Sequence, residues 1–291
     1  MCRPLLILLF FCSLCSAADL TDLTYDASGS TVTITDCNEN AEGSLIIPSS
    51  IDGKSVTNIG PEAFQNCYDL TSVTLPDSVI TIADQAFHSC SSMTNCSISK
   101  NTTSIGNLAF LECSALTSFS VPSGVTAINQ STFEGCQNLI QISLSPNITS
   151  IGARAFAECN NLQTIIIPKG VTSIGDSIFY GCWELKDVYF LGDAPSSERD
   201  IFGNHASDFS SHHLSSKSGF TTPSWSGGAS TEIDISLSLA ALTYTDNGTS
   251  ITITDCDTSH SGLLIIPDNI DGLNVTAIDS YAIEDCRDIT F

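Results

Sequence analysis

The feature that most constrains this chain is a phrase that returns every 23 residues. Residues 149–159 read TSIGARAFAEC and residues 172–182 read TSIGDSIFYGC. A chain that repeats one unit at a fixed spacing folds as a stack, in which each unit buries its apolar face against its neighbours. We therefore expect a solenoid whose equivalent residues form interior ladders. The two clearest ladders are Phe64, Phe87, Phe110, Phe133, Phe156 and Phe179, and Cys67, Cys90, Cys113, Cys136, Cys159 and Cys182.

Each unit contains one segment in which apolar and polar residues alternate. LTSVTLP at 70–76 and LTSFSVP at 116–122 both end at a proline. Strict alternation predicts a short strand, and proline ends it because it has no N–H to donate. Consecutive units then pair these strands in parallel, about 4.8 Å apart. The predicted fold class is mainly β, a parallel β-solenoid with capping β-hairpins.

The repeat carries a family resemblance. LTSVTLPDSV at 70–79, IADQAFHSC at 82–90 and LQTIIIPKGVTSIGDSIFYGC at 162–182 resemble the BspA-type leucine-rich repeats, a 23-residue class found in secreted and surface proteins. The resemblance covers residues 45–193. It implies a solenoid of the leucine-rich type, and it is also the source of the expectation that the protein binds or adheres.

The organisation along the chain follows from where the repeat begins and ends. A single Arg, an apolar run and small residues at the start predict a secretory signal peptide, so we expect a secreted or cell-surface protein. The expected segments are a signal peptide at 1–17, an N-terminal cap and first irregular coil at 18–55, six leucine-rich repeats at 56–193, a C-terminal cap and linker at 194–238, and a second cap with the start of a second array at 239–291.

The second cap is a duplicate of the first. Residues 23–71 return at 242–290 without a gap, and 24 of the 49 aligned pairs are identical. The offset of 219 is not a multiple of 23, so the duplicated unit is a whole cap with its first coils. Because the second array stops within a repeat, we expect the chain to be part of a longer protein.

The charge excludes one class of partner. The chain has 9 Lys and Arg against 32 Asp and Glu, a net charge of −23. Phosphate backbones require clustered cations, so we expect no nucleic-acid partner. No stretch after the signal peptide is long and apolar enough to predict a membrane span.

The cysteine ladder predicts buried free thiols. Stacked cysteines have parallel Cα–Cβ bonds at strand spacing, which leaves their Cβ atoms farther apart than the roughly 3.8 Å that a disulfide prefers. Cys37 and Cys256 occupy matched positions in the two caps, and their bonding is left open.

No motif of catalysis or metal binding is recognisable. After the signal peptide, the sequence lacks paired C-x-x-C spacings, a G-x-S-x-G elbow and phosphate-binding loops. His205, Asp208, His212 and His213 form the only histidine cluster, and a solvated loop is a better interpretation of it than a metal or acid–base site. We expect no enzyme activity, no cofactor and no metal.

The candidate ligand-binding residues are those that point outward from the strands. The ordinary interpretation of such hydroxyl-rich strands is a solvated sheet, and the alternative is a binding face that becomes apolar toward the last turns. The candidates are Ser97, Ser120, Ser143, Ile166 and Tyr189.

Three functions agree with these expectations. The first is a non-enzymatic solenoid that binds an extracellular protein or glycan along a rigid face. The second is a structural spacer or surface-layer element that carries a further domain beyond residue 291. The third is an extracellular hydrolase whose catalytic domain lies in that further part.

Overall fold

The computed structural model describes residues 18–197, 201–214, 217–220, 224–225, 228–233, 241–257, 264–266, 269–280, 282 and 289–290. The chain divides into two compact units, Met1–His212 with Ser218–Thr231, and His213–Lys217 with Glu232–Phe291.

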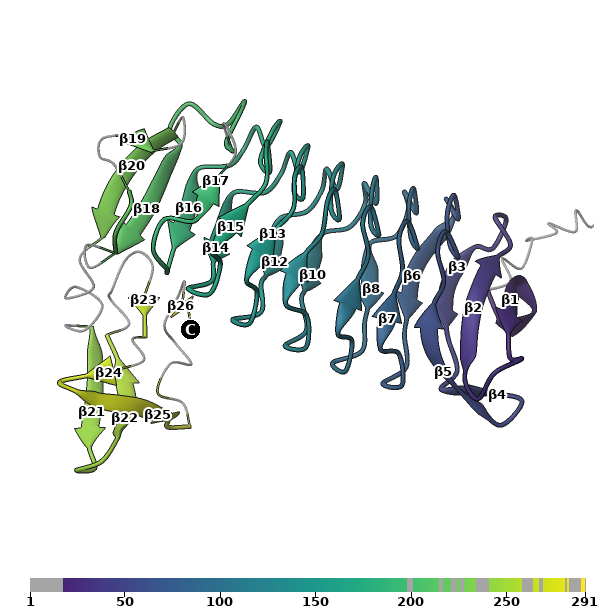
Figure 1. The fold of residues 1–291 in the computed structure, drawn as a ribbon, viewed down its shortest axis with the longest axis horizontal. Coiled ribbons are helices and arrows are strands. Elements are labelled where there is room, and N and C mark those ends of the chain that lie inside the picture. The colour runs from purple at the N-terminus through teal and green to yellow at the C-terminus, as the bar shows by residue number, and fades with distance from the viewer. Residues whose placement is uncertain are drawn as a thin grey trace, which may run out of the picture. The chain divides into compact units, whose positions relative to one another are not determined.

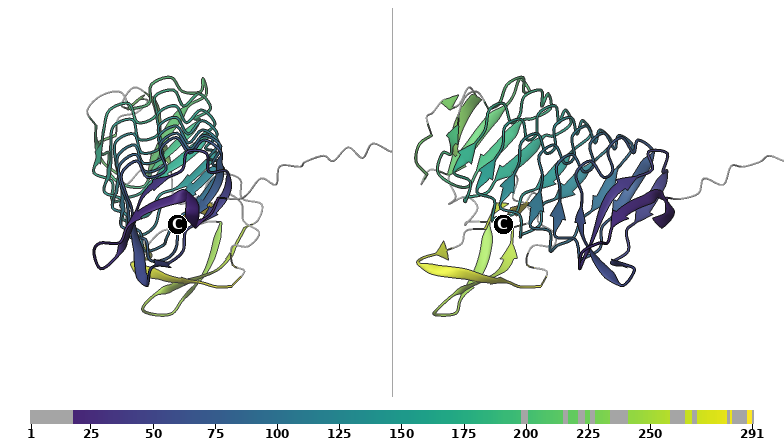
Figure 2. Two further views of the ribbon diagram at one scale, coloured as in Figure 1. Left: turned by 90° about the vertical axis from the view of Figure 1, so that its right-hand side faces the viewer. Right: turned by 45° about the vertical axis from the view of Figure 1, so that its right-hand side comes forward.

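The first unit is a parallel β-solenoid, which confirms the predicted fold class (Figures 1 and 2). Each coil contributes one strand to a front row and one to a back row. The front row consists of β3 (Gly43–Ile46), β6 (Leu70–Thr74), β8 (Asn95–Ser97), β10 (Ser118–Ser120), β12 (Gln141–Ser143), β14 (Thr164–Ile167) and β16 (Asp187–Phe190). The back row consists of β2 (Val32–Cys37), β5 (Lys54–Ile59), β7 (Thr81–Ile82), β9 (Ser104–Ile105), β11 (Ala127–Ile128), β13 (Ser150–Ile151), β15 (Ser173–Ile174) and β17 (Ser196–Ser197).

Between paired strands from β5 to β17 in the back row and from β6 to β16 in the front row, the register equals the sequence repeat. Thr81 pairs with Ser104 in the back row and Thr164 with Asp187 in the front row, each 23 residues apart and parallel. Seen from the end of the stack, the outlines of successive coils lie over one another (Figure 2, left). Equivalent side chains therefore stack on equivalent side chains.

The phenylalanine ladder forms the centre of the core. All six rings are fully buried, and their planes lie within 15° of parallel. Successive centroids are 4.9, 5.2, 5.5, 5.9 and 5.8 Å apart, which is the range of favourable aromatic pairs. Phe202 adds a further ring at 6.2 Å from Phe179, within the segment expected to be a cap.

Each coil closes through a tight turn that contains two residues with a left-handed backbone, four positions apart. Most of these residues are not glycine, although their φ values of 53–63° cost an ordinary residue about 1–2 kcal/mol. Inside the turn, N–H groups donate to carbonyls of the next coil, as from Phe87 to Ala109 at 2.8 Å. The two columns are Glu62, Gln85, Leu108, Ser131, Arg154 and Ser177, and Asn66, Ser89, Glu112, Gly135, Glu158 and Gly181.

Glycine permits the close approach of adjacent coils at Gly152 and Gly175. A Cβ atom at Gly152 would lie 2.6 Å from the backbone N of Gln130, and one at Gly175 would lie 2.4 Å from the N of Ala153. Both distances are shorter than any van der Waals contact, which explains the Ile-Gly pair in these repeats.

The N-terminal end of the solenoid is covered by an antiparallel hairpin. The hairpin consists of β1 (Leu23–Asp26) and β2, with Leu23 opposite Cys37. It is preceded by the 3₁₀ turn η1 (Leu20–Asp22), which Asp19 caps. A second small hairpin joins β4 (Ser50–Ile51) to β5.

The far end of the front row continues into irregular strands. β18 (Ser210–Leu214), β20 (Gly228–Ile233) and β19 (Ser224–Trp225) follow β16 in the order of one five-stranded sheet.

The second unit repeats the strand pairing of the N-terminal cap. β21 (Leu242–Asp246) and β22 (Ile251–Cys256) form an antiparallel hairpin in which Leu242 lies opposite Cys256. β25 (Leu273–Ile278) pairs in parallel with β22 and antiparallel with β24 (Asn269–Ile270). β23 (Leu264–Ile265) pairs with β26 (Ile289–Thr290) in parallel. The duplicated sequence thus folds into a duplicated hairpin.

Candidate binding face

The front row presents a polar surface because its strands alternate. The middle residue of each strand enters the core, as Cys96 and Phe119 do, and the residues on either side of it face outward. On β8, β10 and β12 the outward side chains are hydroxyls or amides, and all of them are exposed: Asn95, Ser97, Ser118, Ser120, Gln141 and Ser143.

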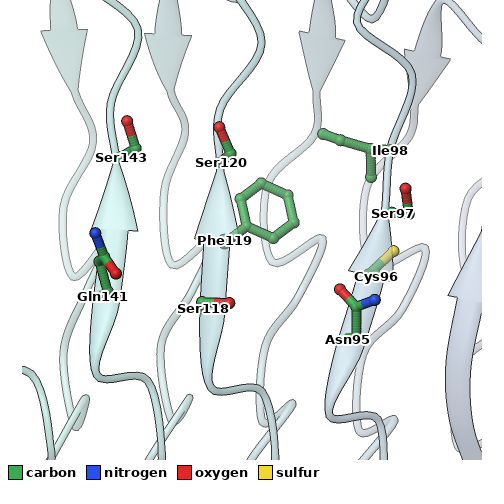
Figure 3. Close-up of a pocket in the computed structure, with 9 residues that line it drawn as sticks. All are labelled: Asn95, Cys96, Ser97, Ile98, Ser118, Phe119, Ser120, Gln141 and Ser143. Carbon is green, nitrogen blue, oxygen red and sulfur yellow. The ribbon is translucent and has the colours of Figure 1, made fainter. Parts of the chain in front are cut away.

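These six side chains line a shallow hollow of about 420 Å³ (Figure 3). The floor and one side include Cys96, Ile98 and Phe119. No lining residue carries an ionised side chain, in a protein whose net charge is −23. The hollow therefore offers neutral hydrogen-bond donors and acceptors over an apolar floor.

The hollow lies where the front row changes from one hydrogen-bonded sheet to the next. β8 ends the sheet formed by β3, β6 and β8, and β10 begins the sheet that it forms with β12. The largest step in side-chain size along the buried column, from Cys96 to Phe119, falls at the same place. Figure 3 shows the Phe119 ring and the Ile98 side chain in the space between β10 and β8.

Phe119 is held firmly by the core beneath it. Its ring meets the edges of Phe110 and Phe133, with centroids 4.9 and 4.8 Å apart and interplanar angles of 61°. The floor of the hollow is thus fixed to the central ladder.

The structure brings together three of the five predicted ligand-binding residues. Ser97, Ser120 and Ser143 line the hollow, and Ser120 lies directly beside Ser143 in register. Ile166 and Tyr189 are register partners in the next sheet, outside the hollow, and both are half-buried.

Tyr189 is covered by the C-terminal segment of the unit. Its ring stacks on His212, with centroids 4.6 Å apart and planes 19° from parallel. His212 Nε2 lies 2.7 Å from Asp187 Oδ1, and His212 Nδ1 lies 2.6 Å from Thr231 Oγ1. Both ring nitrogens are therefore engaged in structural contacts.

The remaining members of the histidine cluster also make local contacts. His205 Nδ1 lies 2.8 Å from the carbonyl of Ala206, and Asp208 forms an ion pair with Lys186 at 3.5 Å. Within the described residues, no group of three or more His, Cys, Asp or Glu side chains is placed to hold a metal ion.

Sequence reasoning did not single out Asn95, Ser118 and Gln141. The signal was present, because strand alternation puts the residue before each buried position on the same face as the residue after it. The five predicted residues all lie on the C-terminal side of a buried position.

The cysteine ladder consists of buried free thiols. Each thiol after the first donates to the carbonyl of the phenylalanine 26 residues earlier, as from Cys113 to Phe87 at 3.0 Å. Burial raises the pKa of the Cys182 thiol to about 12 and raises that of Cys159 well above its ordinary value. These thiols act as small apolar groups in the folded protein.

The fold and its polar strand face define a leucine-rich-repeat solenoid. The sequence pattern described as "BspA type Leucine rich repeat region", with six copies, matches residues 57–186 and 103–217, which is more than half of the chain. The chain belongs to the BspA-type leucine-rich repeat family.

One solved structure supports this assignment. A leucine-rich repeat protein of T. pallidum is 28% identical over 62% of this chain and 85% of its own, with a TM-score of 0.56. A structure described as a leucine rich cell surface protein of Faecalibacterium prausnitzii is 22% identical over 92% of this chain and 74% of its own, with a TM-score of 0.46. No curated protein shows significant similarity to the chain.

Across the described part of the chain, none of the helices has the length and apolar character needed to cross a membrane.

Proposed function

We propose that the protein is secreted or displayed at the cell surface and acts as a non-enzymatic binding or adhesion protein. Its binding site is the hollow on the front row, and its ligand is an extracellular protein or glycan. The observation that carries this proposal is the set of six exposed, uncharged hydroxyl and amide side chains gathered over an apolar floor.

The hollow suits a neutral polar ligand. Hydroxyl and amide groups both donate and accept hydrogen bonds, which are the interactions that peptide backbones and sugar hydroxyls make. The acidic character of the chain disfavours anionic ligands. The strands hold the polar groups in fixed register, so that little ordering entropy is lost when a ligand binds.

The test is a binding screen of the full chain against extracellular matrix proteins and an array of neutral glycans. The blocking variant is Ser120→Tyr, which fills the hollow with a residue that the same column carries at Tyr189. The matched control is Gln137→Tyr, because that exposed position belongs to the turn column that carries Tyr68.

We expect Ser120→Tyr to weaken binding of the captured ligand at least tenfold and Gln137→Tyr to leave it unchanged. If both variants bind the ligand equally well, the hollow is not the binding site. Failure of the unmodified protein to bind any member of either panel would favour the structural spacer.

A further inference from the structure

Two buried thiols lie side by side where the N-terminal hairpin meets the first coil. Cys37 ends β2 and is 3% exposed, and Cys67 follows the first turn and is fully buried. Their sulfur atoms share one acceptor, since the carbonyl of Asn38 lies 3.8 Å from Cys37 Sγ and 3.9 Å from Cys67 Sγ. Cys67 Sγ also lies 4.0 Å from the carbonyl oxygen of Cys37 itself.

Cys67 differs from the rest of its ladder. The later thiols donate to phenylalanine carbonyls at 3.0–3.3 Å. On the N-terminal side of Cys67, the described residues contain no coil with an equivalent phenylalanine. The Cys67 thiol instead contacts the carbonyls of Asn38 and Cys37 at the longer distances of 3.9 and 4.0 Å. Its neighbour in that direction is Cys37. The first thiol of the ladder is therefore the one with the longest carbonyl contacts, and its neighbour is a cap cysteine outside the ladder.

The duplicated cap provides an internal comparison. The offset of 219 residues aligns Cys37 with Cys256 and Cys67 with Cys286. The two hairpins share their register, with Leu23 opposite Cys37 and Leu242 opposite Cys256. Cys256 is disulfide-bonded, whereas Cys37 is a free thiol.

We propose that Cys37 and Cys67 form a disulfide when the chain folds in an oxidising compartment, and that this bond clasps the N-terminal hairpin to the first coil. The compartment follows from the proposed secretion, but the bond itself depends only on the geometry of the cap.

The reaction is thiol–disulfide exchange with a small disulfide such as oxidised glutathione. One cysteine thiolate attacks the small disulfide, which forms a mixed disulfide and releases one glutathione thiolate. The second cysteine thiolate then attacks the protein sulfur of that mixed disulfide and releases the second glutathione thiolate. In total the two protein thiols lose two electrons and two protons, and the oxidant becomes two thiols.

Exchange takes place before the cap has closed. Both sulfurs are buried in the folded unit, and the neighbouring Cys67 thiol together with burial raises the pKa of the Cys37 thiol. A protonated and inaccessible thiol does not attack a disulfide. The bond therefore forms during folding or during opening of the hairpin.

The test is refolding of the full chain in vitro with reduced and oxidised glutathione, which requires no export. The refolded protein is unfolded, alkylated and digested with chymotrypsin without reduction. Tyr68 and Phe87 then separate Cys67 from Cys90. We expect a linked peptide pair containing Cys37 and Cys67, lighter by two hydrogens than the separate peptides. The Cys256 disulfide in the same digest shows that the conditions were oxidising.

Two outcomes would overturn the proposal. One is recovery of both Cys37 and Cys67 as alkylated thiols in a sample in which Cys256 is bonded. The other is a bond from Cys37 to any cysteine other than Cys67. Neither outcome would bear on the ligand-binding hollow, which is measured separately.

A thermal unfolding measurement shows whether the Cys37–Cys67 disulfide stabilises the first unit. Reduction is expected to lower the thermal midpoint of the wild-type first unit by about 5–10 °C. Cys37→Ser should remove this difference, whereas the control Cys90→Ser, in the same ladder, should retain it. An equal difference in all three proteins would contradict the clasp.

Discussion

The Phe119 ring meets the edge of Phe110 at a centroid distance of 4.9 Å and an interplanar angle of 61°. Phe119 lies on the front strand β10, whereas Phe110 lies in the turn that precedes this strand. The contact therefore ties the polar face to the central ladder. Damage to the ladder should reach the candidate binding site.

The first prediction concerns this ladder. Phe110→Ala removes a fully buried ring that contacts Phe87, Phe119 and Phe133. We expect the free energy of unfolding to fall by about 3–5 kcal/mol, because the cavity cannot be refilled from a rigid stack. Urea unfolding followed by circular dichroism measures it. The control is Ile140→Ala at an exposed position, and a comparable loss there would contradict the ladder as the main source of stability.

The second prediction concerns the close approach of coils. Gly152→Ala places a Cβ atom 2.6 Å from the backbone N of Gln130, so the coils must separate. We expect a loss of about 1–3 kcal/mol, as for other overpacked sites. Gly29→Ala is the matched control, since nothing lies within 4 Å of its Cβ position. Thermal unfolding of the two variants should differ clearly, and equal midpoints would show that the coils can separate freely.

The third prediction uses the left-handed turn columns. Ser177 has a φ of 56°, where glycine is free of strain. We expect Ser177→Gly to stabilise the first unit by about 0.5–1 kcal/mol. This is the backbone strain that glycine relieves, minus the cost of the greater entropy that glycine gives the unfolded chain. Ser173→Gly, the same change within strand β15, should destabilise it. Loss of stability in both variants would show that the serine side chain matters more than backbone strain at position 177.

The fourth prediction concerns pH. Burial raises the pKa of Cys113, Cys159 and Cys182, that of Cys182 to about 12. In the unfolded chain a cysteine loses its proton near pH 8.5. Between that pH and the folded pKa, the unfolded state binds fewer protons than the folded state, so stability falls as pH rises.

The measurement is the urea midpoint under reducing conditions between pH 7 and 9.5. We expect a midpoint that is level up to about pH 8 and then declines, with a smaller decline in Cys182→Ala. Native protein should also fail to react with a thiol reagent until it is unfolded. A constant midpoint, or rapid labelling of native protein, would contradict burial of these thiols.

The repeated features of the fold were predictable from the sequence, because a period of 23 residues forces equivalent residues to stack. This applies to Phe64 and Phe87. The cap hairpins at Leu23 and Leu242 were predictable from a different signal, the return of residues 23–71 at 242–290. Only Gly135 and Gly181 indicate the left-handed turns in the sequence. The same columns hold Glu and Ser in other repeats, and these residues do not predict a left-handed backbone. Backbone conformation at these positions is imposed by the stack.

The candidate site was predictable only in part. Strand alternation placed Ser97, Ser120 and Ser143 on one face, but the hollow depends on where β8 and β10 cease to share a sheet. Strand alternation predicts an open face for Tyr189, yet its ring stacks on His212, which belongs to a segment without the repeat. Such contacts arise from irregular chain, for which no period exists to guide prediction.

The equality between strand register and repeat length has an evolutionary consequence. A deletion or duplication of a whole 23-residue unit within the array would leave each remaining side chain above an equivalent neighbour. Recombination between repeats could thus lengthen or shorten the protein by about 4.8 Å at a time without redesigning its interior. Natural members of this family should differ in solenoid length by whole numbers of coils, while their terminal hairpins remain similar.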